Sequence, residues 1–566
     1  MKRLNQTMLP LLAASLISVN PVWAADQPTR KPASPAATEQ IKQLQELSPE
    51  AQKSLDLLFA TIPDLQKYRV KSVNKRENRP PFYHSPIWSI SLTTQPENAE
   101  KGDIQEYGSA RVQLDAKTGR LLSLDIQDPA WASSNYPDPK LARAKADAFI
   151  HAMLGKSFEA SQRIGKGSSG RGDENGKKLQ WAHLTVRYFP LINNIPLRSD
   201  TISVSVDAAG HIVEYNAFDY VDPTLVTWPN SKEALSYDEA RTIFTEKLEM
   251  KLLFDSNLPI SYDQSGRISA QRPILMYYPD TFYRIDAISG KPLDTVSEPT
   301  EETVKVKGAG KTVKITSREE AEKWLKERFG IDVANTTFEY EDHKNNLEEG
   351  LQQIESYHWF NISDLPQIPY EAVSITTDAQ SDLLIDFDLE LPESREADSK
   401  ISVSEAKKKA IEALEDFLDP SLTELQLHVP SDEEPIPDWV DVSKLEKEEK
   451  EEEQNYSFYF RVKRSGVDVD NEFYDVGIDQ VSGAVTKLNL HPLKPGTTLP
   501  DMSKIVSAQE AEETFKNEID AELVYIWEKY RNQRAPQPKL VYQRKLKNEY
   551  SFIDATTGQL IQVSRP

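Results

Sequence analysis

A short phrase that recurs along the chain places an aspartate, whose carboxylate could bind a cation, a few residues before a glycine. Clear copies occupy 114–121, 206–212, 285–293, 478–485 and 553–560, with the aspartates Asp115, Asp207, Asp286, Asp479 and Asp554. A calcium site needs about six to eight clustered oxygens, whereas each phrase offers one carboxylate. Such an aspartate accepts backbone N–H bonds, and the glycine supplies the positive φ of a tight loop. We therefore predict that each phrase is the tip of a β-hairpin and not a metal site.

Two other groups of acids could act as the opposed carboxylates of a glycosidase. Asp386 and Asp388 alternate with apolar residues, which is the pattern of a strand with one solvated face. Asp468 and Asp470 lie in a hairpin whose counterpart in the first half of the chain, 194–200, has no acids at the corresponding positions. A duplicated site would recur in both halves. We predict that all four carboxylates lie on the solvent-exposed surface.

Motifs that would position a nucleophile, a catalytic metal or a phosphate are missing from the sequence. It contains no HExxH, no GxSxG, no P-loop, and no S-x-x-K with its partner motifs. None of the histidines pairs with another at ligand spacing, so we interpret them as strand-end or surface residues, with His211 exposed. They are His84, His151, His183, His211, His343, His358, His428 and His491. We predict no catalytic, cofactor-binding or metal-binding residue, no cofactor and no enzyme activity.

Serine followed three residues later by glutamate marks the start of four helices. These serines are Ser236, Ser317, Ser402 and Ser507. The pattern is that of a capping box, in which each side chain binds a backbone donor at the helix start. Variant starts near Ser48 and Asp138 give two more helices, and helical apolar spacing extends the last helix through Phe515 to Ile519 and Leu523.

Alternating apolar runs flank each hairpin phrase, as in ISVSV at 202–206, where every second residue lies on one face. Each unit is therefore predicted to be a helix followed by an antiparallel meander that ends near the Asp-Gly hairpin. The fold class is α+β, with tandem units that each pack one helix on one sheet face. The segments 165–178 and 444–454 are expected to be surface insertions at equivalent loops of the two middle units.

The units form two blocks of three, because corresponding phrases are 263, 273 and 268 residues apart. A worn copy at 377–384 carries Asp382 in place of glycine, so that hairpin is expected to turn differently or more loosely. Trp88 and Trp359 stand 271 residues apart, and core packing is favoured over an aromatic peptide-binding groove. The predicted divisions are a signal peptide at 1–24, a linker at 25–37, a first block at 38–298 (units 38–135, 136–230 and 231–298), a linker at 299–311 and a second block at 312–566 (units 312–398, 399–500 and 501–566).

The sequence predicts that the protein is located outside the cytoplasm. A basic start, an apolar stretch and small residues before a cleavage point near Ala24 are typical of a signal peptide. No later segment approaches the length of an apolar membrane span, and cysteine is absent. The formal net charge of -23 argues against nucleic acid and anionic membranes as partners. We expect a secreted or cell-envelope associated protein.

The helix, the strands and the closing DA-x-[TS]-G hairpin resemble PepSY domains, and more closely the YcdB/YcdC repeated-domain family of exported bacterial proteins. The resemblance is carried by 187–216 and 460–489, which share an aromatic strand, a tight turn, a strand and the hairpin phrase. Asn194 replaces the turn glycine that Gly466 keeps, and asparagine tolerates positive φ. The third units, 273–293 and 538–560, resemble the last hairpin of a PepSY domain.

The resemblance implies a non-catalytic role, because PepSY modules act as inhibitors and folding aids in the propeptides of thermolysin-type peptidases. We expect a protein partner, either an exported peptidase or another exported or envelope polypeptide, bound through an exposed edge strand. A structural scaffold of the cell envelope or surface layer is the alternative, and a hydrolase of an unrecognised type is a third. The oligomeric state is left open.

Overall fold

The computed structural model describes most of the chain. It covers 47–76, 85–96, 107–172, 178–199, 201–218, 220, 226–262, 268–280, 282–293, 300–342, 353–361, 370–392, 400–429, 436–445, 454–494, 496–531, 533–546 and 550–563. The predicted signal peptide and first linker lie outside these residues, as does most of the predicted insertion at 444–454.

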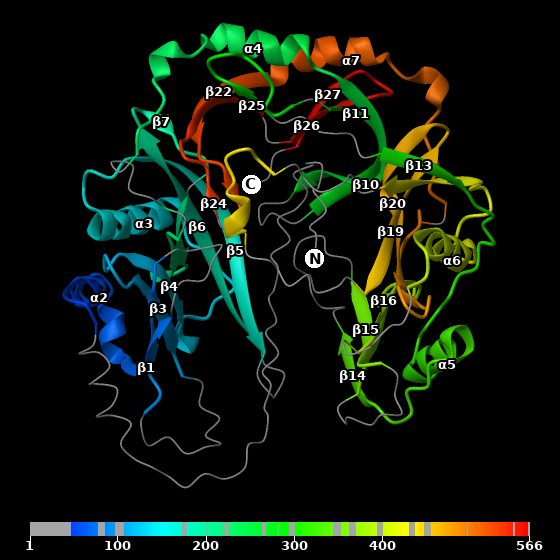
Figure 1. The fold of residues 1–566 in the computed structure, drawn as a ribbon, viewed down its shortest axis with the longest axis horizontal. Helices are drawn as coiled ribbons and strands as arrows, with labels where there is room; N and C mark the ends of the chain where they lie inside the picture. The colour runs from blue at the N-terminus through cyan, green and yellow to red at the C-terminus, as the bar shows by residue number, and fades with distance from the viewer. Residues whose placement is uncertain are drawn as a thin grey trace.

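The structure is mixed α+β, with far more strand than helix and several antiparallel sheets (Figure 1). The helices are α2 (Pro49–Thr61), α3 (Pro139–Leu154), α4 (Tyr237–Glu246), α5 (Arg318–Phe329), α6 (Val403–Glu415) and α7 (Ala508–Phe515). The strands of the first half are β1 (Arg69–Arg76), β2 (Ile87–Thr93), β3 (Ser109–Asp115), β4 (Leu121–Gln127), β5 (Ala160–Gly172), β6 (Lys178–Ile192), β7 (Ile195–Pro196), β8 (Ile202–Asp207), β9 (Ile212–Asn216), β10 (Met250–Tyr262), β11 (Ile268–Pro279) and β12 (Arg284–Asp286). Those of the second half are β13 (Thr300–Lys305), β14 (Thr337–Asp342), β15 (Ile354–Phe360), β16 (Ala372–Asp378), β17 (Leu384–Glu390), β18 (Glu424–Val429), β19 (Asn455–Arg464), β20 (Val467–Asp479), β21 (Val485–His491), β22 (Ile519–Ile526), β23 (Lys529–Tyr530), β24 (Gln533–Arg534), β25 (Lys539–Leu546), β26 (Tyr550–Asp554) and β27 (Leu560–Val563). None of the helices in the described ranges combines the length and the apolar character that a membrane crossing requires.

The helices begin at the residues that the sequence indicated. Ser236 and Ser507 form complete capping boxes, while the side chains of Ser317 and Ser402 each accept the N–H of the glutamate three residues on. The end of the last helix was predicted wrongly, because α7 stops at Phe515 and Ile519 begins a strand. Apolar residues four apart also suit the step from a helix into a buried strand, so the helical period alone cannot locate the end.

The Asp-Gly phrases form hairpin tips in the structure, as predicted. Asp115 Oδ1 accepts the backbone N–H groups of Lys117 and Thr118 at 2.8 and 2.6 Å, and Gly119 has a φ of +73°. The carboxylates of Asp207, Asp286, Asp479 and Asp554 likewise accept N–H groups two to four residues on. Each aspartate thereby satisfies turn donors that the ladder leaves unpaired.

The worn copy turns in the same way as the others, so the expectation of a different or looser hairpin was wrong. Asp382 adopts a φ of +59°, close to the +69° of Gly483 at the same place in the next copy. Its N–H donates to the carbonyl of Asp378 at 2.8 Å, and the Asp378 carboxylate accepts the N–H of Ser381. Aspartate tolerates this left-handed conformation better than most residues, at some cost relative to glycine.

Within each half, the first two units join into one sheet through their last strands. In the first half the order is β1-β2-β3-β4-β9-β8-β6-β5, and Asp125 of β4 pairs with Glu214 of β9. In the second half β14-β15-β16-β17 continue through β21 and β20 to β19 and β18. Helix α3 packs on β6, β8 and β9, and α6 packs on β19, β20 and β21. A hydrophobic core lies between sheet and helices in each half, around Phe149 in the first and Phe387 in the second.

The third units of the two halves exchange their hairpins. Strand β11 of the β10–β11 hairpin in the first half pairs with β26 of the second, whereas β25, which pairs with β22 in the second half, pairs with β12 of the first. Helix α4 packs on β22 and β25, and α7 packs on β10 and β26. Figure 1 shows the orange β22 and β25 above the cyan strands on one side and the green β10 beside the yellow and orange strands on the other. The meander predicted for each of these units is therefore built from both halves of the chain.

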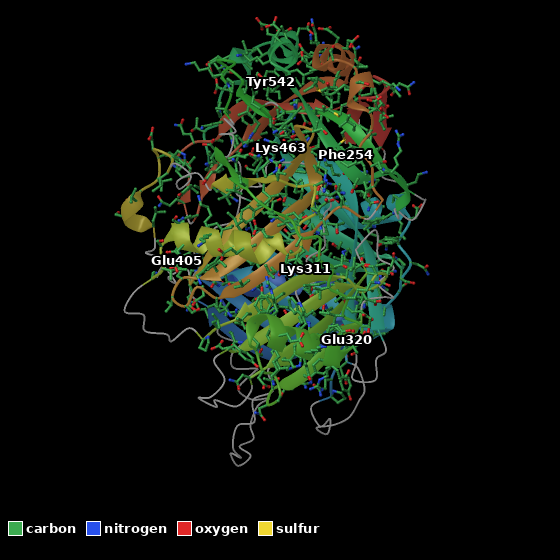
Figure 2. The ribbon with its side chains drawn as sticks, turned by 90° about the vertical axis from the view of Figure 1, so that its right-hand side faces the viewer. Phe254, Lys311, Glu320, Glu405, Lys463 and Tyr542 are labelled. Carbon is green, nitrogen blue, oxygen red and sulfur yellow. The ribbon has the colours of Figure 1, made fainter. Side chains whose placement is uncertain are left out.

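The bonds that hold the exchanged hairpins are reciprocal. Tyr277 of β11 donates its hydroxyl to the carbonyl of Val506 ahead of α7, and Tyr542 of β25 donates to Leu235 ahead of α4, at 3.0 and 2.8 Å. Phe254 of β10, which Figure 2 labels with Tyr542 in the upper part of the molecule, is fully buried in a core that draws on both halves. Each half thus contributes a strand tyrosine that bonds to the backbone ahead of the other half's helix.

Each exchanged hairpin also contacts the middle unit of the other half. Leu253 and Phe254 pair in parallel with Asp468 and Val469 at the start of β20. At the corresponding place, Leu197 forms a parallel bridge with Tyr525 of β22, and the Arg198 N–H donates to the Tyr525 carbonyl at 2.9 Å. The two halves are therefore joined through four strands and not through a linker alone.

Two segments predicted as loops form strands. The predicted linker 299–311 contains β13, whose six residues pair antiparallel with β18 along its outer side. The predicted insertion 165–178 instead lengthens β5 as far as Gly172, and Lys178 opens β6. Polar composition misled the prediction in both places, because an edge strand carries solvated side chains as a loop does.

We predict that Asp382→Gly raises the free energy of unfolding by up to about 1 kcal/mol, because glycine adopts the left-handed conformation without a Cβ clash. The exchange in the opposite direction, Gly483→Asp, is the matched variant and is expected to destabilise the protein. Denaturant unfolding of both variants measures the effect. A loss of stability in Asp382→Gly would contradict the prediction.

We also predict that residues 38–298 and 299–566, produced as separate chains, fold only together, because each lacks the hairpin that its own α4 or α7 covers. Co-expression with a tag on one half is expected to recover both halves in equal amounts with one cooperative thermal transition. Two halves that each unfold cooperatively alone and do not associate would show that the exchange is dispensable.

Candidate functional site

Asp468 and Asp470 were predicted to lie on the solvent-exposed surface, but Asp468 is buried and Asp470 is only partly exposed. Asp468 is 6% exposed and Glu472 is fully buried. Glu472 accepts two bonds from Arg464, at 2.7 Å from Nε and 2.6 Å from Nη2, so its charge is compensated by a two-point ion pair. The prediction was wrong because a distant part of the chain, the β10–β11 hairpin, packs beside this strand.

Asp468 lies in a network of charges where the first-half hairpin meets β20. Its carboxylate is within 3.7 to 3.8 Å of Lys251, Arg461 and Lys463. Lys463, which Figure 2 labels in the same region, also binds Glu301 of β13 at 2.8 Å. The network therefore connects β10, β13, β19 and β20, and it serves the junction between the halves.

A second carboxylate of this junction is held in an unfavourable environment. Asp255 of β10 is 8% exposed, and burial raises the pKa of its carboxyl to about 6, with a further contribution from Asp470. It accepts bonds from the Asn471 side chain at 3.1 Å and from the Asn257 N–H at 2.7 Å. The N–H of Ser256 donates in turn to Asn471 at 3.2 Å, so this cluster latches the exchanged hairpin to β20.

The acids of 386–390 lie near the open face of the second-half sheet, as predicted for Asp388, which is exposed. Asp386 is only partly exposed, and burial together with Asp388 raises its pKa to about 6. Lys487 of β21 is the neighbour of Asp388 across the strand pair and binds Asp475 at 2.8 Å. Lys487 therefore supplies a positive charge among the acidic side chains of the second half.

The equivalent face of the first-half sheet carries a row of polar side chains that crosses six strands. In register, the row runs through Arg111, Asp125, Glu214, Ser205 and Thr185 and ends at Gly165 of β5. Ser205 donates to Glu214 at 3.0 Å, and its hydroxyl lies 2.8 Å from that of Thr185. In this row Glu214 holds the position that Lys487 holds in the other half.

A cavity of about 310 Å³ opens beside this row, at the low end of the size of ligand pockets. Strands β4, β9 and β6 contribute Asp125, Glu214, His183 and Trp181, and β5 contributes the backbone wall at 167–169. The His183 imidazole lies over Gly167, where a Cβ would come within 2.5 Å of Nε2. The indole of Trp181 donates to the carbonyl of Asp128 at 3.0 Å, which holds that ring in place.

The electrostatics of the cavity favour a positively charged ligand. The protein atoms around the Asp125 carboxyl and the neighbouring Glu214 raise its pKa, and Arg111, its register partner on β3, opposes this shift. Burial lowers the pKa of His183, so the imidazole is neutral at pH 7. The side chains facing the cavity therefore place two carboxylates, and no cation of their own, in its lining. A cation placed between the carboxylates would relieve their mutual repulsion.

The remaining singled-out residues have structural roles. Trp88 and Trp359 are buried, as expected for core packing. His211 is not simply exposed, since its ring stacks on Trp131 at 4.2 Å and binds the Asp207 carboxylate at 2.8 Å. Within the described ranges, no group of three or more histidines and acids is placed to hold a metal ion.

Sequence reasoning missed Asp125 and Glu214, and it left His183 among scattered surface histidines. A signal for the site exists in the sequence. When 212–216 is aligned with 485–489, glutamate stands against lysine at one position of the duplicated strand. This charge reversal marks a position at which the two copies of the fold differ in chemistry.

Comparison with known proteins supports part of the resemblance. Residues 332–491 match the family model described as the YcdB, YcdC repeated domain. The match begins just after α5 and ends with β21, so it covers the sheet of the second half that carries Lys487. A search of curated proteins found no match.

We predict that Asp255→Asn stabilises the protein at pH 8 by on the order of 2 kcal/mol, because the native carboxyl is charged there although burial disfavours its charge. A raised native pKa gives stability that is present below about pH 4 and is lost as pH rises through about 6. The gain of the variant is therefore expected to shrink towards zero at pH 4.

Urea unfolding of the variant and the parent from pH 4 to pH 8 gives their free energies of unfolding and tests this prediction. Asp501→Asn is the matched control, because Asp501 is exposed and hydrogen bonds from Ser503 hold its pKa below the usual value. No gain is expected for that variant at pH 8. A gain for Asp255→Asn that does not change with pH would show that the Asp255 charge is not its cause.

Proposed function

We propose that this chain, which carries the YcdB, YcdC repeated domain at 332–491, is an exported and non-catalytic protein that binds an extended segment of another exported polypeptide along the open edge of β5. The proposed partner is an exported peptidase, which the protein inhibits or assists, or another polypeptide of the same compartment. The lack of catalytic motifs in the sequence and the resemblance of the units to PepSY modules support this proposal.

The observation that carries the proposal is a difference between the two halves. In the second half, β13 covers the outer side of β18 by antiparallel pairing from Thr300–Val429 to Lys305–Glu424. In the first half, β5 stands at the equivalent edge, and no strand of the described residues pairs with its outer side. Strand β13 thus shows, within the same chain, the kind of strand that pairs with such an edge.

The backbone of β5 is oriented to accept a strand. The Ala182 N–H donates to the Ser133 carbonyl, on the side of β6 away from β5, so even-numbered residues of this part of β6 turn their backbone groups away from β5. In this register the even-numbered residues of β5, such as Ile164 and Lys166, turn theirs outward. Gly165 and the exposed Arg163 keep the solvated face of the strand uncrowded and polar.

A second candidate function, a scaffold of the cell envelope, is favoured by the exchanged hairpins. They tie the two halves into one body, as a load-carrying structural protein requires. An envelope scaffold would remain with the cell fraction, whereas a binding partner of secreted polypeptides would be recovered from the medium. Fractionation therefore separates the two functions.

We predict that Lys166→Pro lowers the affinity for short extended peptides, displayed as an array, by at least about tenfold, because proline removes the outward N–H. Lys166→Ala keeps that N–H and is expected to bind as the parent does. Hydrogen exchange is expected to slow along β5, but not along β18, when a peptide binds.

Binding that survives Lys166→Pro, or that protects amides elsewhere and not in β5, would contradict the proposed edge. The assay for the peptidase role uses an exported metallopeptidase and measures its rate with and without the protein. The parent is expected to slow the peptidase and Lys166→Pro to have less effect.

A further inference from the structure

The cavity of the first half lies beside the proposed edge. Its wall at 167–169 is part of β5, directly along the chain from the outward-facing groups of Ile164 and Lys166. Strands that add to a sheet place alternate side chains on one face, and pockets beside the edge then select among those side chains. A strand that docks along β5 therefore brings side chains to the mouth of this cavity.

The second half contains a filled version of the same position. In its polar row, Asp388 pairs with Lys487, and Lys487 pairs with Gly477, as Asp125, Glu214 and Ser205 pair in the first half. The Lys487 ammonium binds Asp475 at 2.8 Å and is attracted by Asp386 and Asp388. The fold thus already binds one lysine ammonium at this row.

In the first half a carboxylate, that of Glu214, stands in the place of this lysine. Arg111 neighbours Asp125 on the side away from Glu214, so it does not stand between the two acids. The Glu214 carboxylate is held by Ser205, and the cavity opens between these strands and β5.

We propose that the cavity lined by Asp125, Glu214 and Trp181 binds the lysine side chain of the polypeptide that docks along β5. The ammonium lies between the two carboxylates, and the alkyl chain passes along the wall formed by 167–169. This assignment deepens the proposed function and rests on it, since the docked strand delivers the side chain. It gives the partner a stated chemistry, an extended segment with a lysine on the face that is turned to the cavity.

The experiment compares peptides of one sequence that carry lysine, norleucine or glutamate at a single position. Calorimetry with the full chain is expected to show at least tenfold tighter binding of the lysine peptide than of the norleucine peptide, and the weakest binding for glutamate. Glu214→Lys places an ammonium where the second half has one and is expected to abolish the preference. Glu214→Gln is expected to reduce it, and Asp388→Asn, at the equivalent position of the other half, to leave it intact.

The outcomes separate this inference from the function on which it rests. If peptides bind β5 with equal affinity for lysine and norleucine, the cavity assignment is overturned and the edge remains. If no peptide binds, saturation-transfer NMR with N-acetyl-lysine methylamide decides the cavity alone. Binding of this probe that Glu214→Lys abolishes and Asp388→Asn preserves supports the cavity without the edge. Absence of binding to the parent overturns the cavity as well.

Discussion

The exchange of the β10–β11 and β22–β25 hairpins is the constraint on which the rest of the structure depends. Each hairpin carries a fully buried aromatic residue, Phe254 or Tyr525, and burial of one such side chain contributes about 1.5 to 3 kcal/mol. Helices α4 and α7 cover strands of the opposite half, so neither can bury its apolar face without the other half of the chain. The positions of the two large sheets follow from this pairing, because each hairpin also extends along a middle unit.

A duplicated fold separates what maintains the structure from what differs between the copies. The hairpin tips, helix caps and reciprocal tyrosine bonds recur in both halves, which indicates structural roles. The two halves differ where β13 covers β18 while no strand among the described residues covers β5, and where Glu214 replaces Lys487. The first difference lies at the outer edge of the middle unit, and the second lies on β9 at its opposite flank, with the polar row crossing the strands between them.

Local features of this fold could be read from the sequence, and long-range ones could not. The N-caps at Ser48 and Asp138 and the turn at Asp115 depend on bonds within a few residues, so composition and spacing suffice to predict them. Asp468 was misplaced because a period of two residues identifies the faces of a strand, and whether a distant hairpin covers one of them is set by tertiary packing. The exchange was hidden for a related reason: the alternating pattern identifies the strands of a hairpin and does not say which sheet they join.

The composition of β5 bears on how an open edge can persist in a protein. A long edge strand offers unpaired backbone groups to any other strand, and proteins limit this with charge, glycine and irregularity. Glycines occur at 165 and 167, and Arg163 and Lys166 put charge beside the outward groups. These residues weaken pairing with a second copy of β5, because like charges would meet across the new ladder. They do not oppose a different strand that has no clustered cations at those positions. The edge can therefore resist pairing with a second copy of β5 and still accept such a strand.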